Sequence, residues 1–584
     1  MKSFFKTFFA ALLAFFVFWL IVFFFFMGIA ASTFSKQAPL IPEKSVLTIN
    51  LENRYDEIPK SDYQSMLKSK SIDEPPGLYD VIRLIKKAKD DKKISGILLE
   101  AGENSNGFAA SDEIREALKD FKTSGKFIIA YSDAMSQRAY SIANIANKVY
   151  VSPKGFFEWV GYSVNYTFIK GTLDKLEIKP QIFYAGKFKS ATEPLRADKM
   201  TDANRLQTSE WLNDIYNDLL MKTSESRKVD TATLHNLANT GAIDTPEDAV
   251  THKLIDGVKY DDELKDELKK NLSVGAKDKI SFVSIEKYAS ANTNLSGSGE
   301  KIALIYAQGN IIDGRGDDDN IGGTTYINLI RKARLDESIK AIVLRVNSGG
   351  GSALASENIN REISLAKKVK PVMVSFGDVA ASGGYYISCS ADSIFAGSNS
   401  ITGSIGVFGV VPDMSSFFKN KLGVTFDGVK TGPLANAGNI DHPMNDQEKK
   451  IVQSSIERIY SQFKERVADG RKKDTAYIET IAQGRVWTGL KAKEIGLIDA
   501  FGGLQTAINA AASKAKLKEF EVVEFPEKQT LLEKILSMGT GDTVAAKIKA
   551  DMGEAYYLVY KQLTVVRQLT QGAQARLPFD FFIK

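Results

Sequence analysis

An internal repeat constrains the fold of this 584-residue chain more than any other feature of its sequence. Residues 94–100 resemble residues 339–345 at an offset of 245, and the same offset pairs residues 111–114 with residues 356–359. The offset holds without a gap from residue 94 as far as Gly161. Since this period is far too long for a solenoid, we interpret the chain as two copies of one domain.

Within each copy, short apolar runs rich in β-formers alternate with helical patterns, which is typical of βαβ units around a largely parallel sheet. In the second copy we expect strands at 341–346, 372–376 and 393–396, and helices at 356–368 and 383–390. The sequence therefore predicts an α/β fold with two tandem domains. We divide the chain into an anchor (residues 1–36), a first repeat (45–275), a linker (276–299), a second repeat (300–525) and a C-terminal helical extension (526–584).

The N-terminal segment reads as a transmembrane anchor. Residues 7–35 form 29 consecutive uncharged positions rich in Phe, Leu, Ala, Val and Ile, and about 20 apolar residues span a bilayer core. Lys2 and Lys6 precede the run, so the positive-inside rule predicts a cytoplasmic N-terminus and an exported body. The alternative is a cleaved signal peptide cut near residues 28–32. The apolar region of a cleaved signal peptide usually has only about 7–15 residues. Because the apolar run of this chain is longer, we favour an uncleaved, single-span anchor.

Composition excludes several classes of function. The 76 basic and 71 acidic residues leave a net charge of only +5, which gives no support to nucleic-acid binding. Cys389 is the single cysteine, so an intrachain disulfide framework and a multi-cysteine metal site are ruled out. With three histidines in the sequence, His-rich metal chemistry is not expected either. Catalysis would have to work largely without His and Cys.

Two glycine-containing corners of the second copy have the pattern of a reaction site. Gly349, Gly350 and Gly351 directly follow an expected strand, where backbone N–H groups can face a ligand without side-chain obstruction. Such donors suit an oxyanion or a phosphate, or the run is simply a flexible turn. Ser382 lies between an expected strand and a helix, next to Gly383. It could present a nucleophilic hydroxyl or merely cap the helix.

The two copies differ at these positions. At the offset of 245, Gln137 replaces Ser382, so a nucleophile is expected in the second copy alone. Conversely, the first copy carries Lys189, where the second copy has approximately Gly432. This pattern indicates that one copy supplies a nucleophile and the other a basic side chain.

A serine nucleophile needs a base, and none of the three histidines has a supporting sequence context. Lysine is the alternative, although its ordinary pKa of about 10.4 must be lowered by burial. Nearby Lys187 would lower the pKa of Lys189, and Glu193 would oppose that if it pointed inward. The residues alone leave this choice open.

These features together resemble a known family. The anchor, the duplication, Lys189 within residues 188–194 (Phe-Lys-Ser-Ala-Thr-Glu-Pro) and Ser382 within residues 380–386 (Ala-Ala-Ser-Gly-Gly-Tyr-Tyr) are similar to the long, two-repeat signal peptide peptidase A family. These are Ser/Lys peptidases of the Clp-protease/crotonase-like superfamily. The resemblance covers about residues 45–525.

The resemblance implies a role for each matching residue. Ser382 would be the nucleophile, Lys189 the general base, and Ser404 would orient the lysine. The oxyanion hole would be formed by backbone N–H groups of Gly383 and of Gly350 or Gly351. Where relatives commonly have Pro, this chain has Gly349, which is expected to loosen the corner without abolishing the hole.

The resemblance also implies partners and a location. The chain would be a homotetramer whose Ser and Lys meet across subunits, held in the inner membrane by residues 7–35 in contact with lipid. Its body would be periplasmic and would degrade apolar leader peptides. No metal, organic cofactor or nucleic acid is called for.

Two other functions are compatible with parts of this pattern. A crotonase-like acyl-CoA enzyme would use similar glycine corners, but it needs no Ser382, and export behind an anchor separates it from CoA. A non-catalytic membrane scaffold would have no need to place Ser382, Gly383 and Lys189 together.

Overall fold

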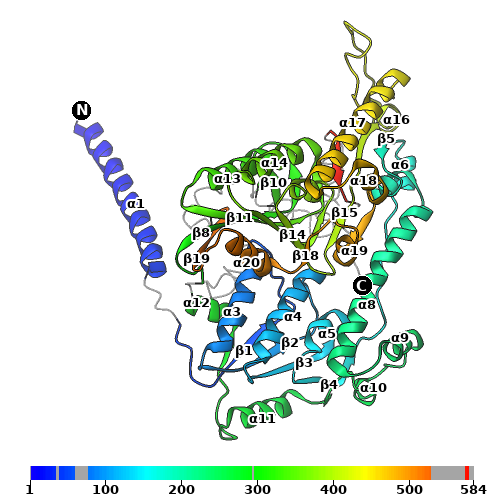
Figure 1. Cartoon of the computed structure of the whole chain (residues 1–584). Coiled ribbons are helices and arrows are strands. Elements are labelled where there is room, and N and C mark those ends of the chain that lie inside the picture. The colour runs from blue at the N-terminus through cyan, green and yellow to red at the C-terminus, as the bar shows by residue number, and fades with distance from the viewer. Residues whose placement is uncertain are drawn as a thin grey trace.

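The computed structural model describes residues 2–34, 39–59, 76–292, 295–317, 319–527 and 572–577. The first helix, α1 (Lys2–Phe34), projects away from the rest of the molecule (Figure 1). Within the described residues, its segment Lys6–Phe24 is the one helix long and apolar enough to cross a membrane, with a hydropathy of 2.6. None of that segment is buried in the protein, as expected of a helix whose apolar surface needs another environment.

The first repeat contains a six-stranded sheet in the order β6-β4-β3-β2-β1-β7, and every neighbouring pair is parallel. Apolar residues on both faces of these strands are buried, as is usual when helices cover a parallel sheet. The strands are β1 (Ser45–Asn50), β2 (Ile94–Glu100), β3 (Phe127–Met135), β4 (Lys148–Phe157), β6 (Gly257–Val258) and β7 (Phe282–Ser284). Its helices are α3 (Leu78–Asp90), α4 (Phe108–Lys122), α5 (Gln137–Ala143), α6 (Lys170–Lys175), α7 (Glu193–Arg196), α8 (Asp202–Arg227), α9 (Thr231–Thr240), α10 (Pro246–Thr251), α11 (Asp261–Leu272) and α12 (Ile285–Ala291).

The second repeat has the same core arrangement, with β18-β14-β13-β11-β8-β19 in the corresponding order and β15 and β17 added beside β13. Its strands are β8 (Glu300–Gln308), β11 (Ile339–Ser348), β13 (Val372–Ala381), β14 (Ser393–Ala396), β15 (Ile401–Gly403), β17 (Val486–Thr488), β18 (Ala500–Phe501) and β19 (Phe520–Phe525). Its helices are α13 (Gly323–Leu335), α14 (Ala353–Ala366), α15 (Gly383–Ser388), α16 (Ser415–Phe417), α17 (Asp446–Arg471), α18 (Thr475–Ile481), α19 (Gly489–Glu494) and α20 (Leu504–Lys514). The predicted duplication and parallel sheets are therefore confirmed.

The linker predicted at 276–299 differs from the structure. β7 and α12 lie within it, and β7 pairs with β1 just as β19 pairs with β8 in the second repeat. The first repeat therefore extends to about α12, and its last strand was missed because three residues carry little sequence pattern. The helical extension predicted at 526–584 falls mostly outside the described residues. Its described residues are 526–527 and 572–577, and the second of these stretches contains a strand, β20 (Gln574–Arg576).

A third sheet joins the two repeats. Its order is β10-β9-β12-β20-β16-β5, built from β5 (Lys179–Ala185), β9 (Asn310–Ile312), β10 (Asn320–Gly322), β12 (Gly350–Ser352), β16 (Val407–Asp413) and β20. β5 leaves the first repeat and pairs antiparallel with β16 of the second along its whole length, from Lys179 opposite Asp413 to Ala185 opposite Val407. This crossing carries the chain that follows β5 into the second repeat.

Candidate active site

Ser382 lies at the corner between β13 and α15, as predicted. Its backbone has φ 53° and ψ −115°, an uncommon conformation for a residue with a side chain, and its N–H donates to the Gly403 carbonyl at 2.8 Å. The side chain makes no capping hydrogen bond to α15, so Ser382 is not an N-cap in the usual sense. Residues held in such strained conformations concentrate at functional sites.

Lys189 approaches Ser382 from the first repeat. Its Nζ lies 2.8 Å from Ser382 Oγ, and both side chains are buried, with 1% and 0% of their surfaces exposed. β5 pairs with β16 as far as Ala185 opposite Val407, and a turn follows in which the Lys189 N–H donates to the Gly186 carbonyl at 3.1 Å. The Phe188 N–H donates to the Gln483 carbonyl at 2.8 Å, so this turn is held against the second repeat. There Gly403, directly before Ser404, pairs with Ala381, directly before Ser382.

Ser404 completes the group of three side chains. Lys189 Nζ donates to the Ser404 carbonyl at 3.1 Å and to its Oγ at 3.0 Å. Ser404 is itself held by a 2.6 Å bond from its N–H to the Arg485 carbonyl. The corner at 402–406, which reads as an ordinary turn in the sequence, therefore supplies two oxygens to the lysine.

Burial lowers the pKa of Lys189 well below its ordinary value, because desolvation disfavours the ammonium form. The influence expected from Lys187 and Glu193 is not found; desolvation is the cause. Glu193 is instead pinned by its own neighbours, accepting hydrogen bonds from the Thr201 hydroxyl and from Asn204 Nδ2 at 2.9 Å. The lysine thus sits among neutral oxygens with no carboxylate to hold its proton.

Two residues that position Lys189 were missed in the sequence. Gly484 has φ 74°, and a methyl group on it would lie 2.7 Å from the Lys189 backbone nitrogen, so only glycine allows this approach. Gln207, on α8, donates from Nε2 to the Phe188 carbonyl and accepts from the Val486 N–H, both at 3.1 Å. Gln207 therefore holds the loop that carries Lys189 against the second repeat. Gly484 begins residues 484–489 (Gly-Arg-Val-Trp-Thr-Gly), a stretch that also resembles the family named above, whereas nothing in the sequence distinguishes Gln207.

The predicted oxyanion glycines lie beside Ser382. Gly350, with φ 97°, packs so closely on Gly383 that a methyl group on Gly350 would lie 2.6 Å from the Gly383 nitrogen. The Gly350 N–H donates to Ser348 Oγ at 3.1 Å and is therefore already engaged. Gly383 is the first residue of α15, where an N–H has no acceptor within its own helix. Gly351 follows in β12.

The expectation that the serine and the lysine meet across subunits is wrong for this structure. Both residues belong to one chain, because β5 crosses from the first repeat to the second within it. Nor does the described part of the chain contain a cluster of His, Cys, Asp or Glu able to hold a metal ion.

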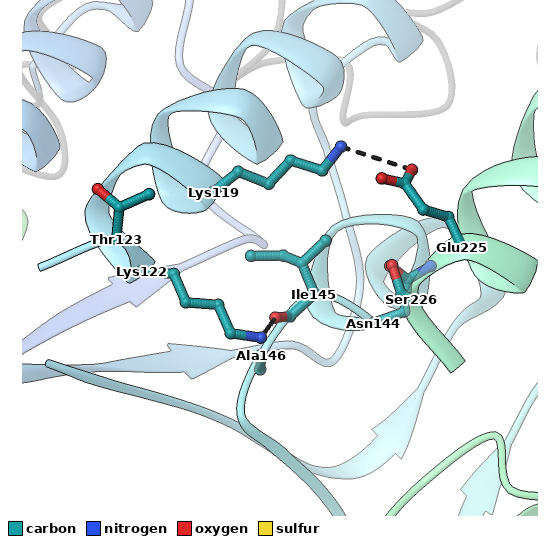
Figure 2. Close-up of a pocket in the computed structure, with 8 residues that line it drawn as sticks. All are labelled: Lys119, Lys122, Thr123, Asn144, Ile145, Ala146, Glu225 and Ser226. Carbon is teal, nitrogen blue, oxygen red and sulfur yellow. Dashed lines mark hydrogen bonds and ion pairs between the residues drawn. The ribbon is translucent and has the colours of Figure 1, made fainter. Parts of the chain in front are cut away.

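A pocket in the described part of the chain lies elsewhere, on the first repeat between α4 and the end of α8 (Figure 2). Its volume is about 300 Å³. Its lysines are already engaged: Lys119 pairs with Glu225 at 3.7 Å, and Lys122 donates to the Ile145 carbonyl at 2.7 Å. It contains none of the residues of the candidate site.

Comparison with known proteins identifies the family. The sequence profile of Peptidase family S49 matches residues 120–275 and 364–518, once in each repeat. The chain belongs to peptidase family S49. Protease 4 of Salmonella typhi is 37% identical over 80% of this chain and 77% of its own length. Serine protease SPPA of Arabidopsis chloroplasts is 32% identical over 91% of this chain and 77% of its own length.

As a member of family S49, the chain is a serine peptidase with two copies of the family domain. A protein of Enterococcus faecium whose name includes "signal peptide peptidase SppA" is 35% identical over 35% of this chain and 60% of its own length. Among solved structures, a ClpP1 mutant from Listeria monocytogenes is similar, with a TM-score of 0.24 and 14% identity, over 35% of this chain and 94% of that one.

Proposed function

We propose that this S49 peptidase hydrolyses peptide bonds with Ser382 as nucleophile and Lys189 as general base. The observation that carries the proposal is the 2.8 Å contact between Lys189 Nζ and Ser382 Oγ, fully buried and free of carboxylates. A neutral amine has two N–H groups and one lone pair. With its N–H groups on the two oxygens of Ser404, its lone pair is left for the proton of Ser382.

The reaction then runs in two halves. Ser382 Oγ attacks the peptide carbonyl carbon as its proton passes to Lys189, and the resulting ammonium gives that proton to the leaving amine when the C–N bond breaks. A water molecule, deprotonated by Lys189, cleaves the acyl ester and frees Ser382. The Gly383 N–H is our first candidate to stabilise the oxyanion. Because the Gly350 N–H is engaged by Ser348 in this structure, Gly351 is the better candidate for the second donor.

We propose cleaved signal peptides as substrates, processed at the membrane. Support comes from the exposed apolar helix α1, which would anchor the protein beside peptides left in the bilayer. The name of the Enterococcus relative points the same way. Lys2 and Lys6 favour a cytoplasmic N-terminus and a periplasmic body at the inner membrane.

We also propose that the protein is a homotetramer, each subunit carrying its own complete dyad. Supporting this, residues 424–430 approximately correspond to β5 in the second repeat, yet they form no strand and expose Val424, Phe426 and Val429. A segment that pairs with another repeat in one copy and is left uncovered in the other suits a contact with a second chain.

The test uses the detergent-solubilised full chain and an apolar peptide ester. Ser382→Ala and Lys189→Ala should each reduce kcat by at least 1,000-fold, as expected for members of one catalytic unit. Lys187→Ala is the matched control and should keep most of the activity, because Lys187 lies two residues away and is not part of the contact. Substantial activity in Ser382→Ala would refute the nucleophile. Mixing the two inactive variants should restore nothing, whereas recovery after subunit exchange would refute a dyad within one chain.

A further inference from the structure

The pocket on the first repeat is lined mainly by polar and charged side chains (Figure 2). Lys119 and Lys122, in the last turn of α4, lie opposite Asn144, which follows α5, and Ser226, near the end of α8 (Figure 2). The pocket has a volume of about 300 Å³. Because one water molecule takes up about 30 Å³ of the liquid, there is room for a ligand several times larger than water.

A buried arginine lies behind this pocket. Arg115 is four residues before Lys119 and seven before Lys122, on the same face of α4, and only 1% of its surface is exposed. Its guanidinium donates to Asn144 Oδ1 and, at 2.9 Å, to Ser226 Oγ, two side chains that line the pocket. Its Nε has no hydrogen-bond partner in the part of the chain that the structure describes.

The hydrogen bonds of Arg115 provide no negative charge. They go to an amide oxygen, a hydroxyl and the main-chain carbonyls of Ser141 and Lys222, all of which are neutral. Burial lowers the pKa of Arg115 from its ordinary value, and the carboxylates of Asp112 and Glu116 oppose this shift without cancelling it. Since a buried charge is costly unless an opposite charge compensates it, an anion in the pocket would supply the missing partner.

The second repeat shows that the fold does not need these cations. At the offset of 245, Arg115 corresponds to Asn360 and Lys119 corresponds to Ser364, both of which are neutral. Asn360 is buried and donates to the Tyr386 carbonyl at 2.8 Å. A neutral donor is therefore sufficient at this position of the domain, and the two positive charges are a property of the first repeat.

The space in front of the arginine also differs between the repeats. α8 and α17 are equivalent helices of 26 residues, each followed by a lysine in the left-handed conformation, Lys228 and Lys472. Aligning these lysines pairs Ser226 with Gly470. A methyl group on Gly470 would lie 2.1 Å from the Cys389 carbonyl oxygen, so α17 packs directly against the turn after α15. A serine cannot pack so closely, and the first repeat has its pocket at this place.

We propose that this pocket binds a phosphate group, either as the free ion or as part of a phospholipid headgroup, through Arg115, Lys119 and Lys122. Phosphate oxygens accept several charge-assisted hydrogen bonds at once, which suits a guanidinium beside two ammonium groups. The hydroxyl of Thr123, at the end of α4, adds a further donor. The proposal goes beyond the peptidase reaction and does not depend on it.

Both lysines can bind the ligand although they already contact the protein. Lys122 donates one N–H to the Ile145 carbonyl and keeps two others. Lys119 lies 3.7 Å from Glu225, whose side chain is 65% exposed and free to turn toward solvent. The phosphate would replace Glu225 beside Lys119. Removal of the glutamate charge should therefore strengthen binding.

Calorimetry on detergent-solubilised, full-length Ser382→Ala tests the site without turnover. The probes are inorganic phosphate and the soluble lipid dihexanoyl phosphatidylglycerol. Lys122→Met should weaken binding of the tighter probe at least about tenfold, whereas Glu225→Gln should strengthen it. Lys367→Met is the matched control, because Lys367 is the equivalent of Lys122 in the second repeat, and it should leave the affinity unchanged. Arg115→Asn, which copies the second repeat, should weaken binding as Lys122→Met does.

The two probes distinguish the sources of the phosphate group. Tighter binding of the lipid, in the part that depends on Lys122, identifies a headgroup, and tighter binding of inorganic phosphate identifies the free ion; both results support the pocket. The proposal is overturned if neither probe binds, or if Lys122→Met and Lys367→Met bind them equally well. Weaker binding by Glu225→Gln also overturns it, because the glutamate would then be part of the site instead of a competitor.

Discussion

At the scale of single residues, the site depends on a lysine that the fold keeps out of water. Lys189 is buried among two serine hydroxyls and a carbonyl, and burial alone lowers its pKa. A surface lysine would stay charged and could not accept a proton at neutral pH. In the proposed mechanism, the neutral amine of Lys189 accepts the proton that a histidine accepts in other serine peptidases.

The activity should therefore rise with pH. The neutral amine is the competent form, so kcat/KM should increase through an apparent pKa below about 10.4, the ordinary value for lysine. A pH–rate profile of the wild-type chain measures this, with Lys187→Ala as a control that should leave the midpoint unchanged. A rate independent of pH from 6 to about 10 would contradict the role of Lys189.

The same burial should cost folding stability. Between the lowered folded pKa and about 10.4, the unfolded chain binds one proton more than the folded chain, so the free energy of unfolding rises with pH in that window, by at most about 1.4 kcal/mol per pH unit. Lys189→Met removes the buried amine and should raise Tm at pH 7. The gain should shrink as the pH approaches 10. Thermal melts of both chains at several pH values measure it, and a Met variant that is less stable at pH 7 would contradict the prediction.

At the scale of secondary-structure elements, two strand pairings bring the reacting groups together. β5 on β16 delivers Lys189, and β15 beside β13 places Ser404 next to Ser382. Gly484, two residues before β17, packs directly against the backbone of Lys189. Main-chain pairing positions both Lys189 and Ser404 relative to Ser382. A small backbone shift therefore changes the distances between their side chains.

Gly484→Ala should therefore reduce kcat by at least tenfold. The added methyl group would lie 2.7 Å from the Lys189 backbone nitrogen and must push Lys189 away from Ser382. A displacement of about 1 Å between reacting groups can lower the rate about 100-fold. Gly432→Ala is the matched control, since a methyl group there meets nothing within 4 Å. Steady-state kinetics decide it, and equal kcat values in the two variants would show that Gly484 has no positioning role.

At the scale of the whole molecule, the two repeats are joined by a buried ion cluster as well as by the third sheet. Arg345, on β11 of the second repeat, contacts Glu57 and Glu113 of the first at 2.7 and 2.6 Å, and the arginine is fully buried. Burial raises the pKa of Glu57 to about 7, although Arg345 opposes the shift. This cluster lies just before the glycine corner that contacts β20.

Arg345→Met should destabilise the protein by about 3–5 kcal/mol, because it leaves buried carboxylates without their partner. Arg458→Met, at an exposed position of α17, should change stability by less than about 0.5 kcal/mol. Urea unfolding of the two variants beside the wild type measures the difference. A loss in Arg345→Met no larger than in the control would mean that the cluster does not hold the repeats together.

The exposed segment 424–430 predicts how the molecule assembles. Val429→Asp places a charge on its most exposed apolar side chain and should lower the mass of the detergent-solubilised oligomer measured by light scattering. Val369→Asp makes the same change at an exposed valine after α14 and should leave the mass unchanged. An unaltered oligomer in Val429→Asp would contradict a role for this segment in the contact.

The sequence by itself determined the duplication and the parallel sheets, and it marked Ser382 and Lys189 as candidates, because local patterns and the differences between the two copies can be read without a structure. The role of Ser404 was predicted from the family resemblance alone. Three things depended on tertiary structure: the meeting of the dyad within one chain, the pairing of β7 with β1, and the place of β20 beside Gly350. Each follows from pairing between strands far apart in the chain, where short segments carry little pattern of their own. Burial of Lys189 belongs with them, since desolvation comes from the packing of both repeats around it.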